Sequence, residues 1–130
     1  MIGLDTNVLV RYIVQDDPGQ ANRAARLFEH RLSREIPGFV NHVVLCELVW
    51  VLESGYGYSR GQIAATLQRL FETDCLRVQS PDLAWQALDG YRRGADFSDV
   101  LIASINIAEG CEHTATFDRR AARSANFRTC

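Results

Sequence analysis

The amino-acid sequence predicts an α/β fold, in which a parallel β-sheet is covered by helices on both faces. Short apolar runs, typical of buried parallel strands, alternate along the chain with longer segments that have helical spacing of apolar residues. A chain of 130 residues with 47% hydrophobic residues can bury roughly two-thirds of its unfolded surface in one core. No linker, repeat or low-complexity tract interrupts the chain, so we expect a single domain over residues 1–130.

The first third of the chain predicts one strand and two helices. Ile2 to Leu4 form an apolar run that is typical of a buried strand, and a short helix is expected from Val8 to Val14. The turn sequence Asp16-Asp17-Pro18-Gly19 ends that helix. Apolar residues at helical spacing then predict a second helix over residues 20–32.

Caps and turn residues delimit the remaining elements. Pro81 is at a first-turn position, which helices tolerate, and Gly110 ends the last apolar helix. The expected elements are a strand at 39–40, a helix at 43–53 capped by Asn41 or His42, a helix from Ser59 to about Phe71, a strand at 76–78, helices at 81–91 and 100–108, and strands at 113–116 and 127–129, the last at a sheet edge.

Composition narrows the class of protein. No segment reaches the roughly 18 apolar residues that a membrane span requires, and the start of the chain lacks the features of a signal peptide. We therefore expect a cytoplasmic protein with no membrane contact. The four scattered cysteines show no metal-site spacing and are expected to be reduced and mostly buried. All fourteen basic residues are Arg, which offers fork-shaped donors for phosphate.

Asp5 stands directly after the first predicted strand. In open α/β sheets, ligands bind in the crevice outside the carboxyl ends of the strands, so this position presents an acid to a ligand. The alternative is structural, because Asp5 or Thr6 could instead cap the following helix.

Glu47 lies in a predicted helix that is apolar nearly all round. We expect this helix to be buried, and an ionised carboxylate there would cost several kcal/mol unless it were paired or bound to a metal. An arginine partner is the main alternative to a metal.

Two further acids occupy similar positions in the second half of the chain. Asp99 begins an apolar helix, and its spacing of three from Asp96 also fits a capping arrangement. Asp118 repeats the Asp5 pattern, because it follows a predicted strand, and Arg119-Arg120 come next and could reach phosphate. Two carboxylates 4 Å apart repel by roughly 4 kcal/mol at an effective dielectric near 20, and a divalent cation removes that conflict. Hard oxygen ligands favour Mg²⁺ or Mn²⁺ over zinc.

Four short motifs contain these acids, at residues 1–7 (MIGLDTN), 45–48 (LCEL), 96–103 (DFSDVLIA) and 116–119 (TFDR). In this order and spacing the chain resembles the PIN-domain family of metal-dependent ribonucleases, and within it the VapC-type toxins of bacterial toxin–antitoxin pairs. The resemblance implies a three-layer α/β/α sandwich around a central parallel sheet, and an endoribonuclease that hydrolyses RNA phosphodiester bonds.

The resemblance also implies roles for individual residues. Asp5, Glu47, Asp99 and Asp118 resemble the acidic quartet that holds one or two Mg²⁺ or Mn²⁺ ions, and Asp96 is a further candidate ligand. Thr6 resembles the hydroxyl position that supports the first acid, and Asn7 a group behind the ligands.

Two partners follow from the same resemblance. A cognate small antitoxin is expected to lie in an apolar groove lined by the helices at 8–14 and 20–32, with an arginine reaching the acids. A homodimer is expected as well, because Trp50, Leu52, Tyr56 and Tyr58 give more apolar area than a small core readily hides.

Two rival functions use the same residues. A Mg²⁺-dependent phosphatase also places an Asp after its first strand, but such enzymes resemble Asp-x-Asp there, whereas this chain has Asp5-Thr6-Asn7. The other rival is a catalytically silent PIN-like interaction module, which is expected to have lost at least one of the four acids.

Overall fold

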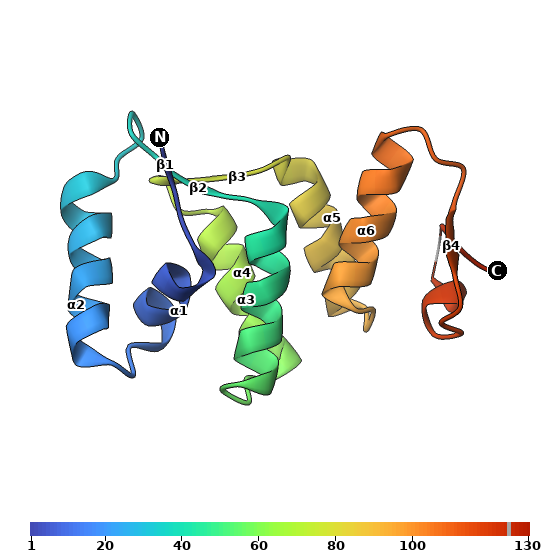
Figure 1. Ribbon diagram of the computed structural model, residues 1–130, viewed down its shortest axis with the longest axis horizontal. Helices are drawn as coiled ribbons and strands as arrows, with labels where there is room; N and C mark the ends of the chain where they lie inside the picture. The colour runs from blue at the N-terminus through green and yellow to red at the C-terminus, as the bar shows by residue number, and fades with distance from the viewer. Residues whose placement is uncertain (125) are drawn as a thin grey trace. The chain divides into compact units, whose positions relative to one another are not determined.

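The computed structural model describes residues 1–124 and 126–130, and it divides into two units, Met1–Pro81 and Asp82–Cys130. The fold class is α/β, as the sequence predicts, and every strand pair described is parallel. Unit 1 contains a three-stranded sheet of order β1-β2-β3, and unit 2 contains a two-stranded sheet of β4 and β5. Figure 1 shows the elements in chain order from blue to red.

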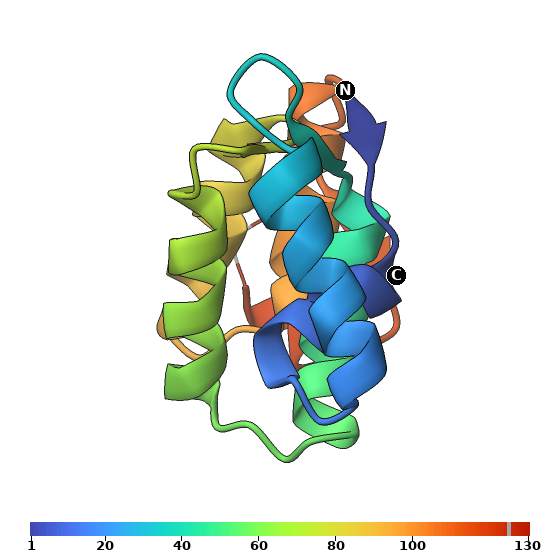
Figure 2. The ribbon, with the colours of Figure 1, turned by 90° about the vertical axis from the view of Figure 1, so that its left-hand side faces the viewer.

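Unit 1 places its three short strands together at one end of its helices, as Figures 1 and 2 both show. The strands are in register, with Gly38 of β2 between Ile2 of β1 and Leu76 of β3. The elements are β1 (Ile2–Gly3), α1 (Thr6–Val14), α2 (Pro18–Arg26), the π-helical turn η1 (Leu27–Arg31), β2 (Gly38–Val40), α3 (His42–Ser54), α4 (Arg60–Phe71) and β3 (Leu76–Val78).

The start of α2 differs from the prediction. Residues 16–19 were expected to form a turn, but Pro18 is the first residue of the helix, and the Asp17 side chain accepts a hydrogen bond from the Gln20 amide at 3.0 Å. Asp17 is thus an N-cap with proline directly after it, an arrangement that helix starts favour. The expected helix also changes character at Leu27, where the π-helical turn begins.

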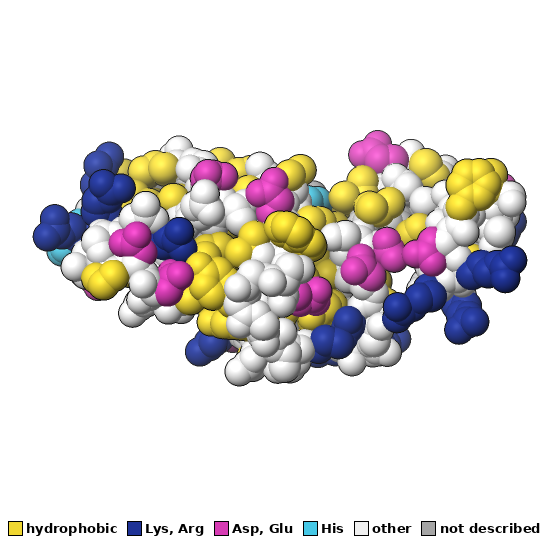
Figure 3. Space-filling model, turned by 60° about the horizontal axis from the view of Figure 1, so that its bottom comes forward, with side chains coloured by type: hydrophobic (Ala, Val, Ile, Leu, Met, Phe, Trp, Pro, Cys, Tyr) yellow, Lys and Arg dark blue, Asp and Glu magenta, His cyan; other side chains and the backbone are white. Residues whose placement is uncertain are grey.

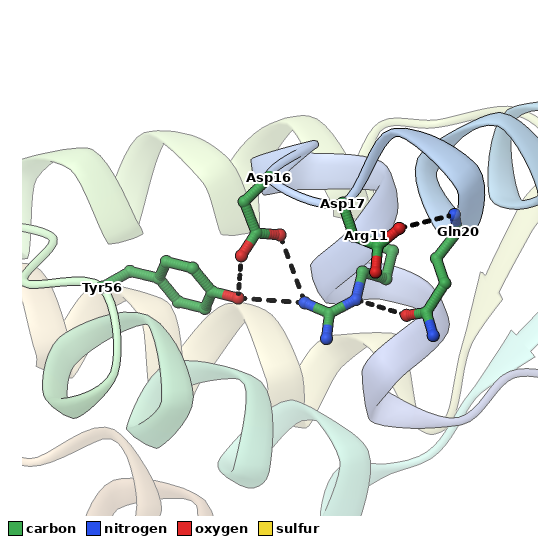
Figure 4. Close-up of polar contacts among 5 residues, drawn as sticks. All are labelled: Arg11, Asp16, Asp17, Gln20 and Tyr56. Atoms are coloured by element: carbon green, nitrogen blue, oxygen red, sulfur yellow. Dashed lines mark hydrogen bonds and ion pairs between the residues drawn. The ribbon is translucent and has the colours of Figure 1, made fainter.

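A cluster of polar side chains joins three segments of unit 1 (Figure 4). The guanidinium of Arg11, on α1, donates to Asp16 at 3.2 Å, to the Tyr56 hydroxyl at 3.0 Å and to Gln20 at 2.6 Å. The Tyr56 hydroxyl in turn donates to Asp16 at 2.9 Å. These bonds raise the pKa of Arg11, with the hydrogen bond to Tyr56 as the largest cause. The cluster joins the end of α1 to the segment after α3; Asp5 caps the start of α1, and Glu47 lies within α3.

Unit 2 contains α5 (Pro81–Arg92, whose first residue closes unit 1), α6 (Phe97–Ala108), β4 (Thr114–Thr116), the 3-10 turn η2 (Ala121–Arg123) and β5 (Phe127–Thr129). Helices α5 and α6 pack closely, because a Cβ atom added at Gly90 would lie 2.7 Å from Cγ2 of Val100. Tyr91 and Phe97 add an edge-to-face ring contact with centroids 6.2 Å apart. Ala103, Ala121 and Phe127 form a small core between α6, η2 and β5.

One expectation about exposure is wrong. The cysteines were expected to be mostly buried, but Cys46 and Cys75 are half-buried, and Cys111 and Cys130 are exposed. Within residues 1–124 and 126–130, no helix has both the length and the apolar character of a membrane span.

Candidate metal centre

The two acids of unit 1 meet at Thr6. The carboxylate of Asp5 accepts a hydrogen bond from the backbone amide of Thr6 at 2.9 Å. The buried hydroxyl of Thr6 donates to Oε2 of Glu47 at 2.8 Å, which connects residues 41 positions apart. The resemblance suggested that this hydroxyl supports the first acid, whereas it contacts the second acid, and the backbone amide contacts the first. One residue therefore orients both carboxylates.

Asp5 is the N-cap of α1 and is exposed to solvent. Asp5 can cap the helix and still present an acid to a ligand, because the capping hydrogen bond uses Oδ1 alone. Among the described residues, the other oxygen of this carboxylate has no protein partner. The neighbouring Asn7 is exposed too, and its side chain makes no hydrogen bond within the described part of the chain.

Glu47 is exposed, so the expectation that its helix is buried all round is wrong for one face. Val43 and Trp50, four residues before and three after Glu47, are 68% and 67% exposed on the same side of α3. The opposite face carries Leu45, Leu48 and Leu52, all fully buried. Sequence could not distinguish the two faces, since both are apolar. The alternative of an arginine partner is not found either, because no ion pair to Glu47 forms within the described residues of unit 1.

Unit 2 brings three carboxylates near one another at the start of α6 and after β4. Asp96 is the N-cap of α6, and its Oδ2 accepts a hydrogen bond from the Asp99 amide at 3.0 Å, which confirms the capping arrangement. Burial raises the pKa of the Asp99 carboxyl above its usual range, and the charges of Asp96 and Asp118 raise it further. A helix N-terminus favours an ionised acid. Burial and like charge therefore act on Asp99 in the direction opposite to that of the helix N-terminus.

Asp118 is held in a tight turn directly after β4. Its amide donates to the Thr116 hydroxyl at 3.0 Å, and its Oδ1 accepts a hydrogen bond from the Arg120 amide at 2.8 Å. The Phe117 ring beside it is 86% exposed. The predicted strand at 113–116 and the observed β4 both end at Thr116, so Phe117 lies in the turn after the strand.

Four of these acids share the same kind of hydrogen bonding. Asp5, Glu47, Asp96 and Asp118 each use one carboxylate oxygen for a protein hydrogen bond, and the second oxygen is left without a partner among the described residues. Taken alone, neither unit places three His, Cys, Asp or Glu side chains in position for a metal ion, as far as its described residues go. Figure 3 shows one face of the molecule on which acidic side chains are exposed, with arginine side chains nearby.

A comparison with protein families identifies the family of this chain. The family described as the PIN domain matches residues 2–126, which is nearly the whole chain. The chain belongs to the PIN-domain family. PIN domains are typically metal-dependent nucleases, they generally use divalent metal ions, and they bind RNA and often pair with antitoxins. No curated protein matches this chain.

Proposed function

We propose that this PIN domain is a metal-dependent endoribonuclease whose site is formed by Asp5, Glu47, Asp99 and Asp118. The observation that carries the proposal is the set of contacts that these carboxylates make and lack. In the described residues none of the four has an arginine or histidine ion-pair partner, and the two of unit 1 share Thr6 as their orienting donor. Acids that bind a cation keep carboxylate oxygens available for it.

The donor set fits Mg²⁺ or Mn²⁺. Carboxylate oxygens are hard ligands of the kind these ions prefer. Burial raises the pKa of Asp99, and the negative charges of Asp96 and Asp118 raise it further. Asp5 and Glu47 from unit 1, and Asp99 and Asp118 from unit 2, would hold the ion, with Asp96 as a further candidate. A bound ion of this kind lowers the pKa of water and offsets charge on phosphoryl oxygens.

The protein's own groups then account for the remaining chemistry. An ionised carboxylate of the set orients the attacking water and accepts its proton, while the water approaches the RNA phosphorus in line with the leaving oxygen. Arg119 and Arg120 are exposed next to Asp118, and their guanidinium groups supply donors for the phosphates on either side of the cleaved bond. Asn7 is placed beside Asp5 as an exposed amide that contacts water or RNA.

We further propose that units 1 and 2 work as one domain over residues 1–130 in the cytoplasm, and that the domain forms homodimers. The surface argument for the dimer is weaker than the sequence suggested. Leu52 is fully buried, and the Tyr56 hydroxyl is bonded to Arg11 and Asp16. The homodimer therefore rests on the resemblance alone, and light scattering that gives about twice the 14.6 kDa chain mass would support it.

The toxin role is supported by a groove in unit 1. A cavity of about 350 Å³ is lined by α1, by Phe28 of η1 and by α4 and β3, so it includes the two helical segments predicted to bind an antitoxin. Leu9, Ile13 and Leu70 contribute apolar surface, and Arg69 lies at the same cavity. A helix or extended peptide with apolar residues facing the cavity and an acid near Arg69 suits this lining.

Cleavage of RNA with and without EDTA tests the nuclease. The isosteric changes Asp5→Asn and Asp99→Asn should abolish cleavage and leave the far-ultraviolet circular dichroism spectrum unchanged. Asp82→Asn is the matched control, because Asp82, like Asp99, is an acid in the first turn of a helix of unit 2, and it lies outside the proposed site. Cleavage that persists in EDTA, or in either site variant, would exclude the proposed mechanism and favour a silent module or another activity.

Growth and co-purification test the toxin role. Expression of the chain alone should arrest growth, and co-expression with a small protein encoded beside it should restore growth and yield a complex. Unharmed growth with no co-purifying partner would remove the toxin role and leave the nuclease in place.

A further inference from the structure

Hydrogen bonds connect helix α1 to α3 and the segment after it at two places. Near the start of α1, the hydroxyl of Thr6 donates to Oε2 of Glu47 at 2.8 Å. Near the end of α1, Nη1 of Arg11 donates to the hydroxyl of Tyr56 at 3.0 Å, in the segment that follows α3. Both helices therefore run from the first contact toward the second.

The contacts around Arg11 are more specific than those of an ordinary surface ion pair. Nη1 of Arg11 donates to both Asp16 and Tyr56, and Nε donates to Gln20 at 2.6 Å. The Tyr56 hydroxyl donates in turn to Asp16 at 2.9 Å, so it both accepts and donates (Figure 4). The side chains of Arg11 and Asp16 are 27% and 45% exposed, and partly exposed ion pairs contribute little to stability. Stability alone therefore does not account for this network.

We infer that Arg11 and Tyr56 are positioning residues for the proposed metal ligands of unit 1, Asp5 and Glu47. The inference rests on the proposed function and adds the residues that hold these two ligands in place. Thr6 and Arg11 are five residues apart in α1, so their contacts are about 7.5 Å apart along the helix and about 140° apart around it. With both contacts present, α1 cannot turn or slide against α3 without breaking one of them.

Apolar packing is the alternative means of holding α1. Leu9 and Val10 are 1% and 2% exposed, so they anchor the helix to the core. Burial is non-directional, whereas hydrogen bonds depend on angle, and a functional site requires its groups to be held within about 0.5 Å. The segment after α3 also has little stiffness of its own, because Tyr56 has glycine on both sides and Gly57 has a φ of +65°. The hydroxyl contacts of Tyr56 supply the missing constraint.

Binding of Mn²⁺ to the full chain tests the inference without RNA and without cleavage. The electron paramagnetic resonance signal of the free ion gives the affinity, at a temperature where circular dichroism shows each variant to be folded. Tyr56→Phe removes one hydroxyl and keeps the ring, and it should weaken Mn²⁺ binding by roughly 3–10-fold. This loss is smaller than the loss of about 10–100-fold that is typical for groups in direct contact with a metal ligand. Arg11→Met keeps an unbranched apolar side chain, removes all three donated bonds and should weaken binding at least as much.

Arg34→Gln is the matched control. Arg34 forms an ion pair with Asp74 at 3.0 Å, which also joins residues 40 positions apart in unit 1 but involves neither α1 nor α3. Loss of this ion pair should leave Mn²⁺ affinity unchanged.

A second comparison tests whether Tyr56 acts through Glu47. Thr6→Val removes the hydroxyl that orients Glu47, so in that background the further change Tyr56→Phe should alter Mn²⁺ affinity by less than about 2-fold. In cleavage assays, Tyr56→Phe should raise the Mg²⁺ concentration for half-maximal rate and leave the rate at saturating Mg²⁺ nearly unchanged.

Several outcomes would overturn the inference. Unchanged Mn²⁺ affinity in Tyr56→Phe would do so, as would an equal loss in Arg34→Gln or a full additional loss in the Thr6→Val background. If Tyr56→Phe does not fold, unchanged affinity in Arg11→Met has the same consequence. If the unaltered chain binds Mn²⁺ and both variants bind it equally well, the inference fails and the proposed function stands. If the unaltered chain binds no Mn²⁺, both fail.

Discussion

Thr6 is the residue whose alteration tests the site most directly, because it is the only described contact that joins Asp5 and Glu47. The change Thr6→Val keeps the branched shape of the side chain and removes the hydroxyl that donates to Oε2 of Glu47 at 2.8 Å. The backbone amide that caps Asp5 is unaffected. The variant therefore separates the Glu47 contact from the Asp5 contact.

The expected loss of stability follows from the burial of the two partners. A hydrogen bond to a charged group contributes about 1.5–3 kcal/mol when it is shielded from water. Thr6 is only 5% exposed but Glu47 is exposed, so water competes for the carboxylate and we expect about 1 kcal/mol. For a chain of this size that loss lowers the Tm by roughly 3–5 °C. Thr6→Ser, which retains the hydroxyl, is the matched control.

The expected loss of metal affinity is larger than the loss of stability. Groups that orient a metal ligand typically contribute a factor of about 10–100 to metal affinity or activity. Thr6→Val should therefore move the Mg²⁺ concentration for half-maximal cleavage upward by at least about 10-fold, with the maximal rate less affected.

A double-mutant cycle with Glu47→Ala isolates the pair, and its coupling should be near the same 1 kcal/mol. An unchanged Mg²⁺ titration together with a coupling near zero would refute the role assigned to Thr6.

Two further predictions concern unit 2. The pKa of Asp99 is raised in the folded protein, so the folded state holds that proton more tightly than the unfolded chain does. The contribution of the Asp99 carboxyl to the free energy of unfolding is therefore fully present at pH values below its ordinary pKa of 3.8. It is lost as the pH rises through the raised pKa of the folded state. In the absence of metal, Asp99→Asn should raise the Tm at pH 7, and this increase in Tm should disappear in acid. An increase in Tm that persists at pH 3 would contradict this account. Gly90→Ala places a Cβ atom 2.7 Å from Val100, which follows Asp99, so thermal unfolding should show a loss of about 1–3 kcal/mol; a Tm equal to that of the unaltered protein would show that α5 and α6 can separate at no cost.

Local signals in the sequence predicted most of the elements. The strands at 76–78 and 127–129 have the expected bounds, and Ser59 caps α4 through a reciprocal pair of bonds with Gln62. Errors occurred where a residue has two permitted local roles. Asp17 was assigned to a turn but caps α2, and α6 begins at Phe97 because Asp96 supplies its cap. Turn and cap use the same side-chain oxygens, so composition alone does not separate them.

Long-range packing explains what the sequence could not predict about the site. The two faces of α3 are similarly apolar, and which face is buried depends on neighbouring elements that pack from distant parts of the chain. The same limit applies to Thr6 and Glu47, whose contact spans 41 residues. Asp5 and Asp118 follow strands and Asp99 lies in the first turn of a helix, so local sequence indicates these three acids. Glu47 lies in the middle of α3, and the exposure and the hydrogen-bond donors of the acids depend on tertiary structure.

Hydrogen-bond donors beside the acids explain how the acids of the proposed site are compatible with folding in the absence of a cation. Four of the acids are each oriented by one nearby N–H or O–H donor, which compensates part of their charge. Asp99 accepts no hydrogen bond among the described residues, and it is the acid whose pKa is raised. We therefore expect a cation bound at the proposed site to stabilise the ionised carboxylate of Asp99 more than those of the other acids. Because a ligand that binds only the folded state stabilises it by RT ln(1 + [L]/Kd), Mg²⁺ should raise the Tm of the wild-type protein more than that of Asp99→Asn.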